Sequence, residues 1–282
     1  MPRIIIFGLG YSAKFIAAAL EARGWEVLST GRSGTLSFDD EGSVRLALSD
    51  ASHVLSSVPP SGEGLDPALE RYGAALNDKW LGYLSSTGVY GDCGGAWVDE
   101  SAQVIGSGPG KGRRTARAEC DAEWLERGAR VFRLPGIYGP GRSALERVRE
   151  GKAHRIAIPD QVFSRVHVDD IAAGVLAGLN ALAGAYNLAD DLPCSQNVVI
   201  EEACRLLGIA QPPMQSLAEA NLSPKARAFY AENRRVANGK AKRLLGWAPR
   251  YPDFAAGLRA LRAMTSPASA STDPASARAV QP

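Results

Sequence analysis

Three small residues near the start of the chain have the spacing that a nucleotide-binding turn requires. Gly8, Gly10 and Ala13 follow the apolar run 4–7, which is predicted to form a buried strand. Gly8 permits a tight turn, Gly10 has no Cβ and lets a pyrophosphate approach the backbone, and Ala13 lets the next helix pack closely on the strand. The N-terminus of that helix offers free N–H groups to phosphate oxygens. A plain glycine-rich turn is the alternative, but the strand–turn–helix context favours a dinucleotide site.

The residue type that follows the second predicted strand bears on which dinucleotide would bind. Residues 25–29 have a strand pattern, and Arg32 lies three residues beyond their end. NAD-binding units often carry an acidic residue in this region to bond the ribose 2′-hydroxyl, whereas an arginine suits a 2′-phosphate. Arg32 therefore favours NADP over NAD, with a solvated turn arginine as the alternative.

The elements that must position these residues alternate regularly. Strand patterns at 4–7, 25–29, 53–58 and 80–85 are separated by helical patterns, which predicts an α/β fold with a doubly wound parallel sheet of the Rossmann type. Ligands of such sheets lie at the C-terminal ends of the strands, so Ser57 and Val58 are predicted to border the cofactor. Residues 92–112 are glycine-rich, and we expect them to form an irregular loop that is either functional or disordered.

The composition is that of a globular protein without a strong charge. The chain has 282 residues, 45% of them hydrophobic, and a formal net charge of +2, which gives no electrostatic case for binding nucleic acid or a membrane surface. Its four cysteines lack Cys-x-x-Cys spacing and its three histidines lie far apart, so we expect free thiols and no metal site. No apolar run approaches the roughly 18 residues of a membrane span, and the N-terminal run is too short for a signal peptide. We therefore expect a cytoplasmic protein whose partner is a small-molecule substrate.

Six short stretches occur along the chain in an informative order. They are Gly8-Leu-Gly-Tyr-Ser-Ala13, Leu84-Ser-Ser-Thr-Gly-Val-Tyr-Gly91, Arg133-Leu-Pro-Gly-Ile-Tyr-Gly-Pro-Gly141, Arg165-Val-His-Val-Asp-Asp-Ile171, Tyr186-Asn-Leu-Ala-Asp190 and Lys242-Arg-Leu-Leu-Gly-Trp-Ala-Pro249. With this set the chain resembles the extended and atypical short-chain dehydrogenase/reductases, the NAD-dependent epimerase/dehydratase family. The resemblance implies a Rossmann domain at 1–142 and a smaller C-terminal substrate lobe at 143–265, with elements that return to the core. It also implies a homodimer, while the composition of residues 266–282 predicts a disordered tail.

The resemblance implies roles for individual residues. Ser86 matches the family's catalytic Ser/Thr at the end of the fourth parallel strand, where its hydroxyl would bond the substrate oxygen; a serine that only caps a backbone group is the alternative. Pro135 and Ile137 match the segment that passes the nicotinamide ring, and His167 belongs to a motif that more often orders the lobe. The predicted cofactor contacts are Gly8, Gly10, Tyr11, Ser12, Ala13, Arg32, Ser57, Val58, Pro135 and Ile137.

One family motif is missing, the Tyr-x-x-x-Lys pair that exchanges a proton with the substrate and holds the ribose. No tyrosine lies between Tyr90 and Tyr138. When Ala118-Glu119 is matched to the family's usual Ala-Glu, Lys111 stands in the place of the tyrosine and Thr115 in the place of the lysine.

Three interpretations remain open at this stage. The protein binds NADP without turnover, as a sensor or scaffold. Alternatively, it is an oxidoreductase or epimerase for a small carbonyl or hydroxyl compound such as a sugar, with Tyr90 or Lys111 as the proton donor. In the third interpretation, an arginine at 113, 114 or 117 clamps an anionic substrate. Ser86 and the strand-end glycines favour an enzyme.

Overall fold

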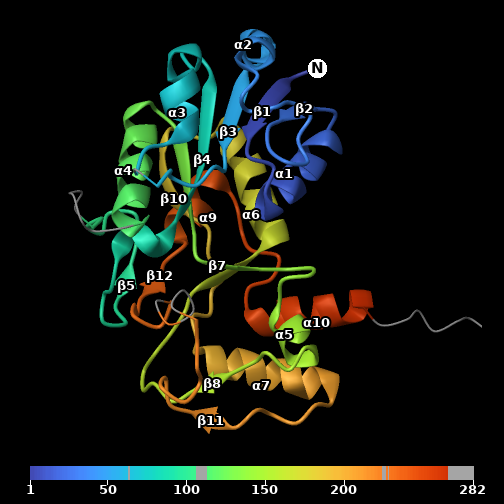
Figure 1. Ribbon diagram of the computed structural model, residues 1–282, viewed down its shortest axis with the longest axis vertical. Helices are drawn as coiled ribbons and strands as arrows, with labels where there is room; N and C mark the ends of the chain where they lie inside the picture. The colour runs from blue at the N-terminus through green and yellow to red at the C-terminus, as the bar shows by residue number, and fades with distance from the viewer. Residues whose placement is uncertain (63, 106–112, 224–226, 228, 266–282) are drawn as a thin grey trace, which may run out of the picture.

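The computed structural model describes the chain except at residues 63, 106–112, 224–226, 228 and 266–282, so Lys111 and the predicted tail lie outside the described residues. The helices and strands, shown in Figure 1, are in chain order β1 (Arg3–Phe7), α1 (Tyr11–Glu21), β2 (Glu26–Ser29), α2 (Glu41–Asp50), β3 (His53–Ser56), α3 (Pro67–Tyr72), β4 (Trp80–Ser86), β5 (Trp97–Val98), α4 (Arg113–Glu126), β6 (Arg130–Leu134), β7 (Gly136–Tyr138), α5 (Ala144–Arg149), β8 (Arg155–Ile156), β9 (Arg165–His167), α6 (Val168–Ala177), β10 (Gly184–Asn187), α7 (Gln196–Leu207), β11 (Met214–Gln215), β12 (Arg235–Val236), α9 (Gly239–Leu245) and α10 (Phe254–Thr265).

A six-stranded sheet forms the centre of the larger part of the molecule. Its strand order is β10-β6-β4-β3-β1-β2, and every neighbouring pair is parallel. This architecture confirms the predicted α/β fold of the Rossmann type. Because β2 lies on one side of β1 and β3 lies on the other, the strand order reverses at β1. In sheets of this kind, ligands bind beyond the carboxyl ends of the strands at such a reversal.

The apolar run of β1 is continuous because helices cover both faces of the sheet. Ile4 and Ile6 belong to one core with α1 and α6, whereas Ile5 and Phe7 belong to a second core with α2, α3 and α4. Side chains alternate between the two faces of a strand, so a strand buried on both faces needs apolar residues at every position. Burial of these four residues fixes the strand whose end carries the glycine turn.

The edge of the sheet at β2 is closed by a turn that folds back on the strand. Leu36 forms a single parallel bridge with Thr30, and its N–H donates to the carbonyl of Ser29 at 3.0 Å. The Thr35 hydroxyl accepts a hydrogen bond from the N–H of Ser29, also at 3.0 Å. A Cβ on Gly34 would lie 2.5 Å from the Ser29 carbonyl oxygen, so only glycine fits where the turn approaches the strand.

A smaller lobe lies at the other end of the molecule in Figure 1, built mainly from α5, α7 and α10. These helices pack around a core that includes Leu145, Ile200 and Leu258. Other late elements return to the sheet, because Ile171 of α6 and Trp247 after α9 belong to the core beneath α1. The strand pair β7–β9 and the strand pair β5–β12 connect the two parts of the chain.

Two stretches differ from what their sequences predicted. The expected irregular loop at 92–112 contains β5, which pairs with β12 from a distant part of the chain that no local pattern identifies. The sequence also predicts a helix over 171–182 that the acidic residues Asp169 and Asp170 open. Helix α6 instead begins at Val168, because His167 caps it by accepting a hydrogen bond from the N–H of Asp169 at 3.2 Å. It also ends earlier, at Ala177, where a 3-10 turn follows.

None of the helices in the described part of the chain is long and apolar enough to cross a membrane. All four cysteines are free.

Candidate active site

The turn after β1 is held by the ends of the two neighbouring strands. Gly8 has a φ of +83°, a left-handed conformation that favours glycine. Its N–H donates to the Thr30 hydroxyl at 3.1 Å, on the side of β2. On the side of β3, the Ser57 hydroxyl donates to the carbonyl of Gly8, and a Cβ on Gly8 would lie 3.1 Å from the Val58 side chain. Ser57 and Val58 therefore lie directly beside the turn and support it.

The N-terminus of α1 opens onto free space. A Cβ on Gly10 would meet no atom within 4 Å. Among the described residues no side chain caps the helix, and its first turn contains no acidic residue. The free N–H groups and the positive end of the helix dipole therefore act on the space in front of Gly10. This combination of open space and unpaired donors fits the pyrophosphate of a dinucleotide.

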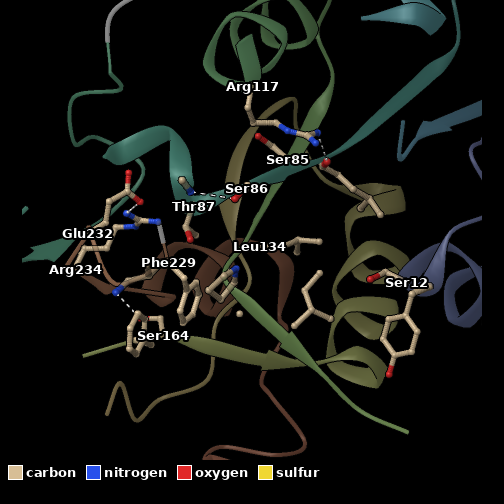
Figure 2. Close-up of a pocket in the computed structure, with 18 of the residues that line it drawn as sticks. Ser12, Ser85, Ser86, Thr87, Arg117, Leu134, Ser164, Phe229, Glu232 and Arg234 are labelled. Carbon is tan, nitrogen blue, oxygen red and sulfur yellow. Dashed lines mark hydrogen bonds and ion pairs between the residues drawn. The ribbon is translucent and has the colours of Figure 1, made fainter. Parts of the chain in front are cut away.

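A cleft of about 610 Å³ runs from this turn, past the end of β4, to the lobe. Figure 2 shows Ser12 toward one side, Ser86 and Thr87 nearer the middle, and Arg234 toward the opposite side. Eight of the predicted site residues line the cleft: Gly10, Tyr11, Ser12, Ala13, Ser57, Ser86, Pro135 and Ile137. Gly8, Val58 and Arg32 are not among the lining residues, and Arg32 is exposed on the turn after β2. The size of the cleft is typical of a site for a cofactor or small molecule.

Ser86 ends β4 and faces the cleft. Its hydroxyl oxygen accepts a hydrogen bond from the N–H of Gly88 at 3.1 Å, so the serine does cap the short helical turn 87–90. That bond uses a lone pair of the oxygen and leaves the O–H free to donate. Capping and donation to a ligand are therefore compatible, and the cap fixes the direction in which the hydroxyl points.

Tyr90 does not lie where a proton donor to the cleft would have to lie. Its hydroxyl donates to Oδ1 of Asn187 at 2.8 Å and accepts from Nη1 of Arg133 at 3.0 Å. The side chain is buried, and this burial raises the pKa of the phenol. Tyr90 is also not among the residues that line the cleft. The structure therefore does not bring Tyr90, which the sequence offers as a replacement for the missing tyrosine, to the cleft, because Arg133 and Asn187 turn its hydroxyl into the interior.

A buried ion pair joins α4 to β6, beside the end of β4 that carries Ser86. The side chains of Asp121 and Arg133 are 1% and 3% exposed. They form two hydrogen bonds, from Nη2 to Oδ1 at 2.6 Å and from Nε to Oδ2 at 3.0 Å. The hydroxyl of Ser85 also donates to Asp121 at 2.6 Å. A buried pair with its hydrogen bonds satisfied holds its elements in one arrangement, so this cluster fixes β4 against α4 and β6.

Helix α4 presents an arginine to the cleft in the region where the family's Tyr-x-x-x-Lys is absent. Nη1 of Arg117 donates to the Tyr83 hydroxyl at 2.7 Å and to the Leu84 carbonyl at 3.3 Å, and the residue lines the cleft. Thr115 is buried and does not line it. The other candidates from this region fall outside the described residues, namely Lys111 and the side chains of Arg113 and Arg114.

Several residues that line the cleft were not predicted from the sequence, among them Thr87, Arg142, Ser164, Phe229, Glu232 and Arg234. Thr87 lies within one of the family-like stretches and Arg142 directly follows another, and these positions were a usable signal. Phe229 and Arg234 come from the segment before β12, which has no pattern that indicates a site.

No protein-family model matches the chain. A solved protein from Silicibacter pomeroyi, described as functionally unknown and conserved, is 36% identical, covers 94% of this chain and 99% of its own, and gives a TM-score of 0.82. The chain belongs to the family of this protein. Protein YeeZ of Escherichia coli K12 is 26% identical over an alignment of 287 positions, which covers 90% of this chain and 97% of YeeZ. A 3-diazoavenalumate denitrifying reductase from Streptomyces is 29% identical over an alignment of 181 positions, which covers 57% of this chain and 58% of the reductase.

The fold of this family is that of the NAD-dependent epimerases and dehydratases. The UDP-glucose 4-epimerase of Thermus thermophilus, solved with NAD, is 20% identical and gives a TM-score of 0.73, with 93% of this chain and 98% of the epimerase covered. The fold therefore confirms the resemblance to the extended short-chain dehydrogenase/reductases that the six ordered stretches indicated.

Proposed function

We propose that this protein is an NADP-dependent oxidoreductase or epimerase that acts on a carbonyl or hydroxyl group of a small molecule. The observation that carries the proposal is the single cleft that joins the glycine turn to Ser86 and to the lobe. Two comparisons support it, since the Thermus epimerase was solved with NAD and the Streptomyces relative is named a reductase. Arg32 favours NADP over NAD, because an arginine suits a 2′-phosphate.

The residues divide into those that hold the cofactor and those that act on the substrate. The turn 8–13, Ser57, Val58, Pro135 and Ile137 would hold the dinucleotide, which supplies a hydride donor or acceptor when bound. Ser86 donates a hydrogen bond to the substrate oxygen, because its own oxygen already accepts from Gly88. Arg117 adds a permanent positive charge to the cleft, and this charge favours negative charge that develops on the same oxygen.

The pair of variants Ser86→Ala and Ser57→Ala tests this division. Ser86→Ala removes only the donor to the substrate, so we expect turnover to fall by about 100-fold or more with NADPH affinity unchanged. Ser57→Ala removes a bond to the glycine turn, so we expect weaker NADPH binding and a smaller change in turnover. The measurements are NADPH oxidation with a panel of aldehydes and ketones and calorimetric titration with NADPH. Unchanged turnover in Ser86→Ala would remove this serine from the mechanism.

A second candidate function is NADP binding without turnover. It is favoured by the lack of a tyrosine between Tyr90 and Tyr138 and by the buried position of the Tyr90 hydroxyl. Tight NADPH binding together with no oxidation for any compound of the panel would support this candidate over the enzyme.

A further inference from the structure

The cleft at Ser86 shares a wall with a second cavity inside the lobe. This lobe cavity has a volume of about 590 Å³ and is lined by residues of β7, α5, α7 and α10, among others. Six residues line both spaces: Gly136, Ile137, Arg142, Phe163, Ser164 and Phe229. The two spaces therefore adjoin, and a ligand whose polar end lies at Ser86 can extend toward the lobe cavity past this shared wall.

Two stacked aromatic rings form part of the shared wall. The ring centroids of Phe163 and Phe229 are 4.3 Å apart and their planes differ by 8°. Tyr230 packs edge-on against both rings, at 5.6 and 5.9 Å. Phe163 is 7% exposed, whereas Phe229 is 47% exposed and lines both spaces. Phe229 therefore keeps a large apolar surface at the cavities, which an aromatic group of a ligand can cover.

Two arginines beside this aromatic wall already have hydrogen-bonded partners in the protein, and the guanidinium group of Arg142 lies over the ring of Tyr11, 5.4 Å from its centroid. Nη1 of Arg165 donates to the carbonyls of Phe163 and Cys194 at 2.9 and 3.1 Å. Arg234 forms an ion pair with Glu232 at 2.6 Å. A diphosphate would have to compete with these partners for the guanidinium groups, whereas an uncharged aromatic group would leave them in place.

The rest of the lobe cavity is suited to apolar groups and is close to balanced in charge. Its lining includes Val199, Phe254 and Leu258, which belong to the core of the lobe. The charged residues that line it are of both signs: three are arginines and two are glutamates, namely Arg142, Arg147, Arg165, Glu146 and Glu150. A ligand that fills the cavity therefore gains mainly from the burial of apolar surface.

We propose that the lobe cavity is a subsite for an aromatic arm of the substrate, whose reacting carbonyl or hydroxyl group lies at Ser86. This inference rests on the proposed function. It narrows the substrate class to aryl alcohols and aryl carbonyl compounds with an extended apolar arm. It replaces the sugar that the family resemblance suggested, and it excludes a nucleoside diphosphate from this subsite.

Calorimetric titration of the full chain with benzyl alcohol, 4-phenylbenzyl alcohol and UDP tests this inference, both with saturating NADPH and without it. An alcohol and NADPH are both in the reduced state, so no turnover disturbs the measurement. We expect 4-phenylbenzyl alcohol to bind at least about tenfold more tightly than benzyl alcohol, because its second ring is buried in the lobe cavity. With NADPH saturating, so that the glycine turn is occupied, UDP should bind more weakly than either alcohol.

Two neighbouring valines of α7 provide a matched pair of variants. Val199 lines the lobe cavity, whereas Val198 is 44% exposed and does not line it. Val199→Trp should fill the cavity and abolish the tenfold preference for the larger alcohol, and Val198→Trp should keep it. Phe229→Ala should lower the binding affinity for both alcohols about fivefold, because the stacking surface is lost. Because Phe229 is half-exposed, this variant decides the question if Val199→Trp does not fold.

Four results would overturn the inference: equal binding of the two alcohols by the unmodified chain, tighter binding of UDP than of either alcohol with NADPH bound, a preference that survives in a folded Val199→Trp, or unchanged binding of both alcohols by Phe229→Ala. Failure of the proposed function is a different result, namely no binding of NADPH. In that case the titrations without NADPH still decide whether the lobe cavity takes an aromatic group.

Discussion

The two ends of the cleft differ in how they are built to recognise a ligand. The end at α1 uses the backbone: a glycine turn, open space in front of Gly10 and the N–H groups of a helix start. The end at the lobe uses the side chains of Ser164, Phe229 and Arg234, which come from distant parts of the chain. A backbone site persists as long as the turn persists, whereas a side-chain site changes with single substitutions on an unchanged fold. The comparison explains how one fold can keep its cofactor and change its substrate.

The largest expected effect concerns a buried carboxyl group near the lobe. Asp190 is buried, and this burial raises the pKa of its carboxyl to about 7. The unfolded chain has the ordinary, lower pKa, so the folded state binds the proton more tightly between about pH 4 and pH 7. The free energy of unfolding should therefore fall as pH rises through this window, by roughly 4 kcal/mol in total, and stay level above it.

Asp190→Asn removes this titration. The free energy of unfolding of the variant should therefore exceed that of the unmodified chain most at pH 8, and the two values should be almost equal at pH 4. Urea unfolding at the two pH values measures the difference. Asp160→Asn, at an exposed position with a φ of 55° that asparagine tolerates, is the control. Parallel stability curves for the unmodified chain and Asp190→Asn would mean that Asp190 is ionised in the folded state.

The second prediction tests the cofactor end alone. Gly10→Asp places a carboxylate in the open space at the start of α1, where it occupies and repels a pyrophosphate. NADPH affinity should fall by at least about 100-fold, which is about 2.7 kcal/mol. Stability should not fall, since aspartate is a good residue at the start of a helix. The neutral variant Gly10→Asn should bind NADPH only about tenfold more weakly than the unmodified chain does. Both variants should bind 4-phenylbenzyl alcohol as tightly as the unmodified chain does. Full NADPH affinity in Gly10→Asp would place the cofactor elsewhere.

The smallest effect is expected from Arg32, at the margin of the same end. We expect the unmodified chain to prefer NADPH to NADH, and Arg32→Ala to reduce that preference about fivefold to tenfold, because one exposed charge–charge contact is lost. Arg23→Ala, another exposed arginine that lies just after α1, should not change the preference. Calorimetric titration with both cofactors gives the ratio. Equal affinities in the unmodified chain would contradict the assignment of Arg32.

The same contrast explains how much of the site could be predicted from the sequence. The turn at Gly8 and Gly10 is a local pattern, and the parallel sheet follows from a regular alternation, so both could be read from consecutive residues. The hydroxyl of Tyr90 could not, because its direction depends on Arg133 and Asn187, which reach it only in the folded chain. The wall of Phe163 and Phe229 likewise arises from the path of the lobe and has no local signature.

The turn that folds back on β2 has a consequence for the behaviour of the protein at high concentration. An edge strand with unpaired backbone groups can recruit a strand from another molecule and start aggregation. Here the Thr35 hydroxyl and the N–H of Leu36 occupy the outward-facing groups of Ser29. A foreign strand would first have to displace these contacts. The segment that presents Arg32 to solvent therefore also shields this margin of the sheet, and changes to its length would endanger solubility.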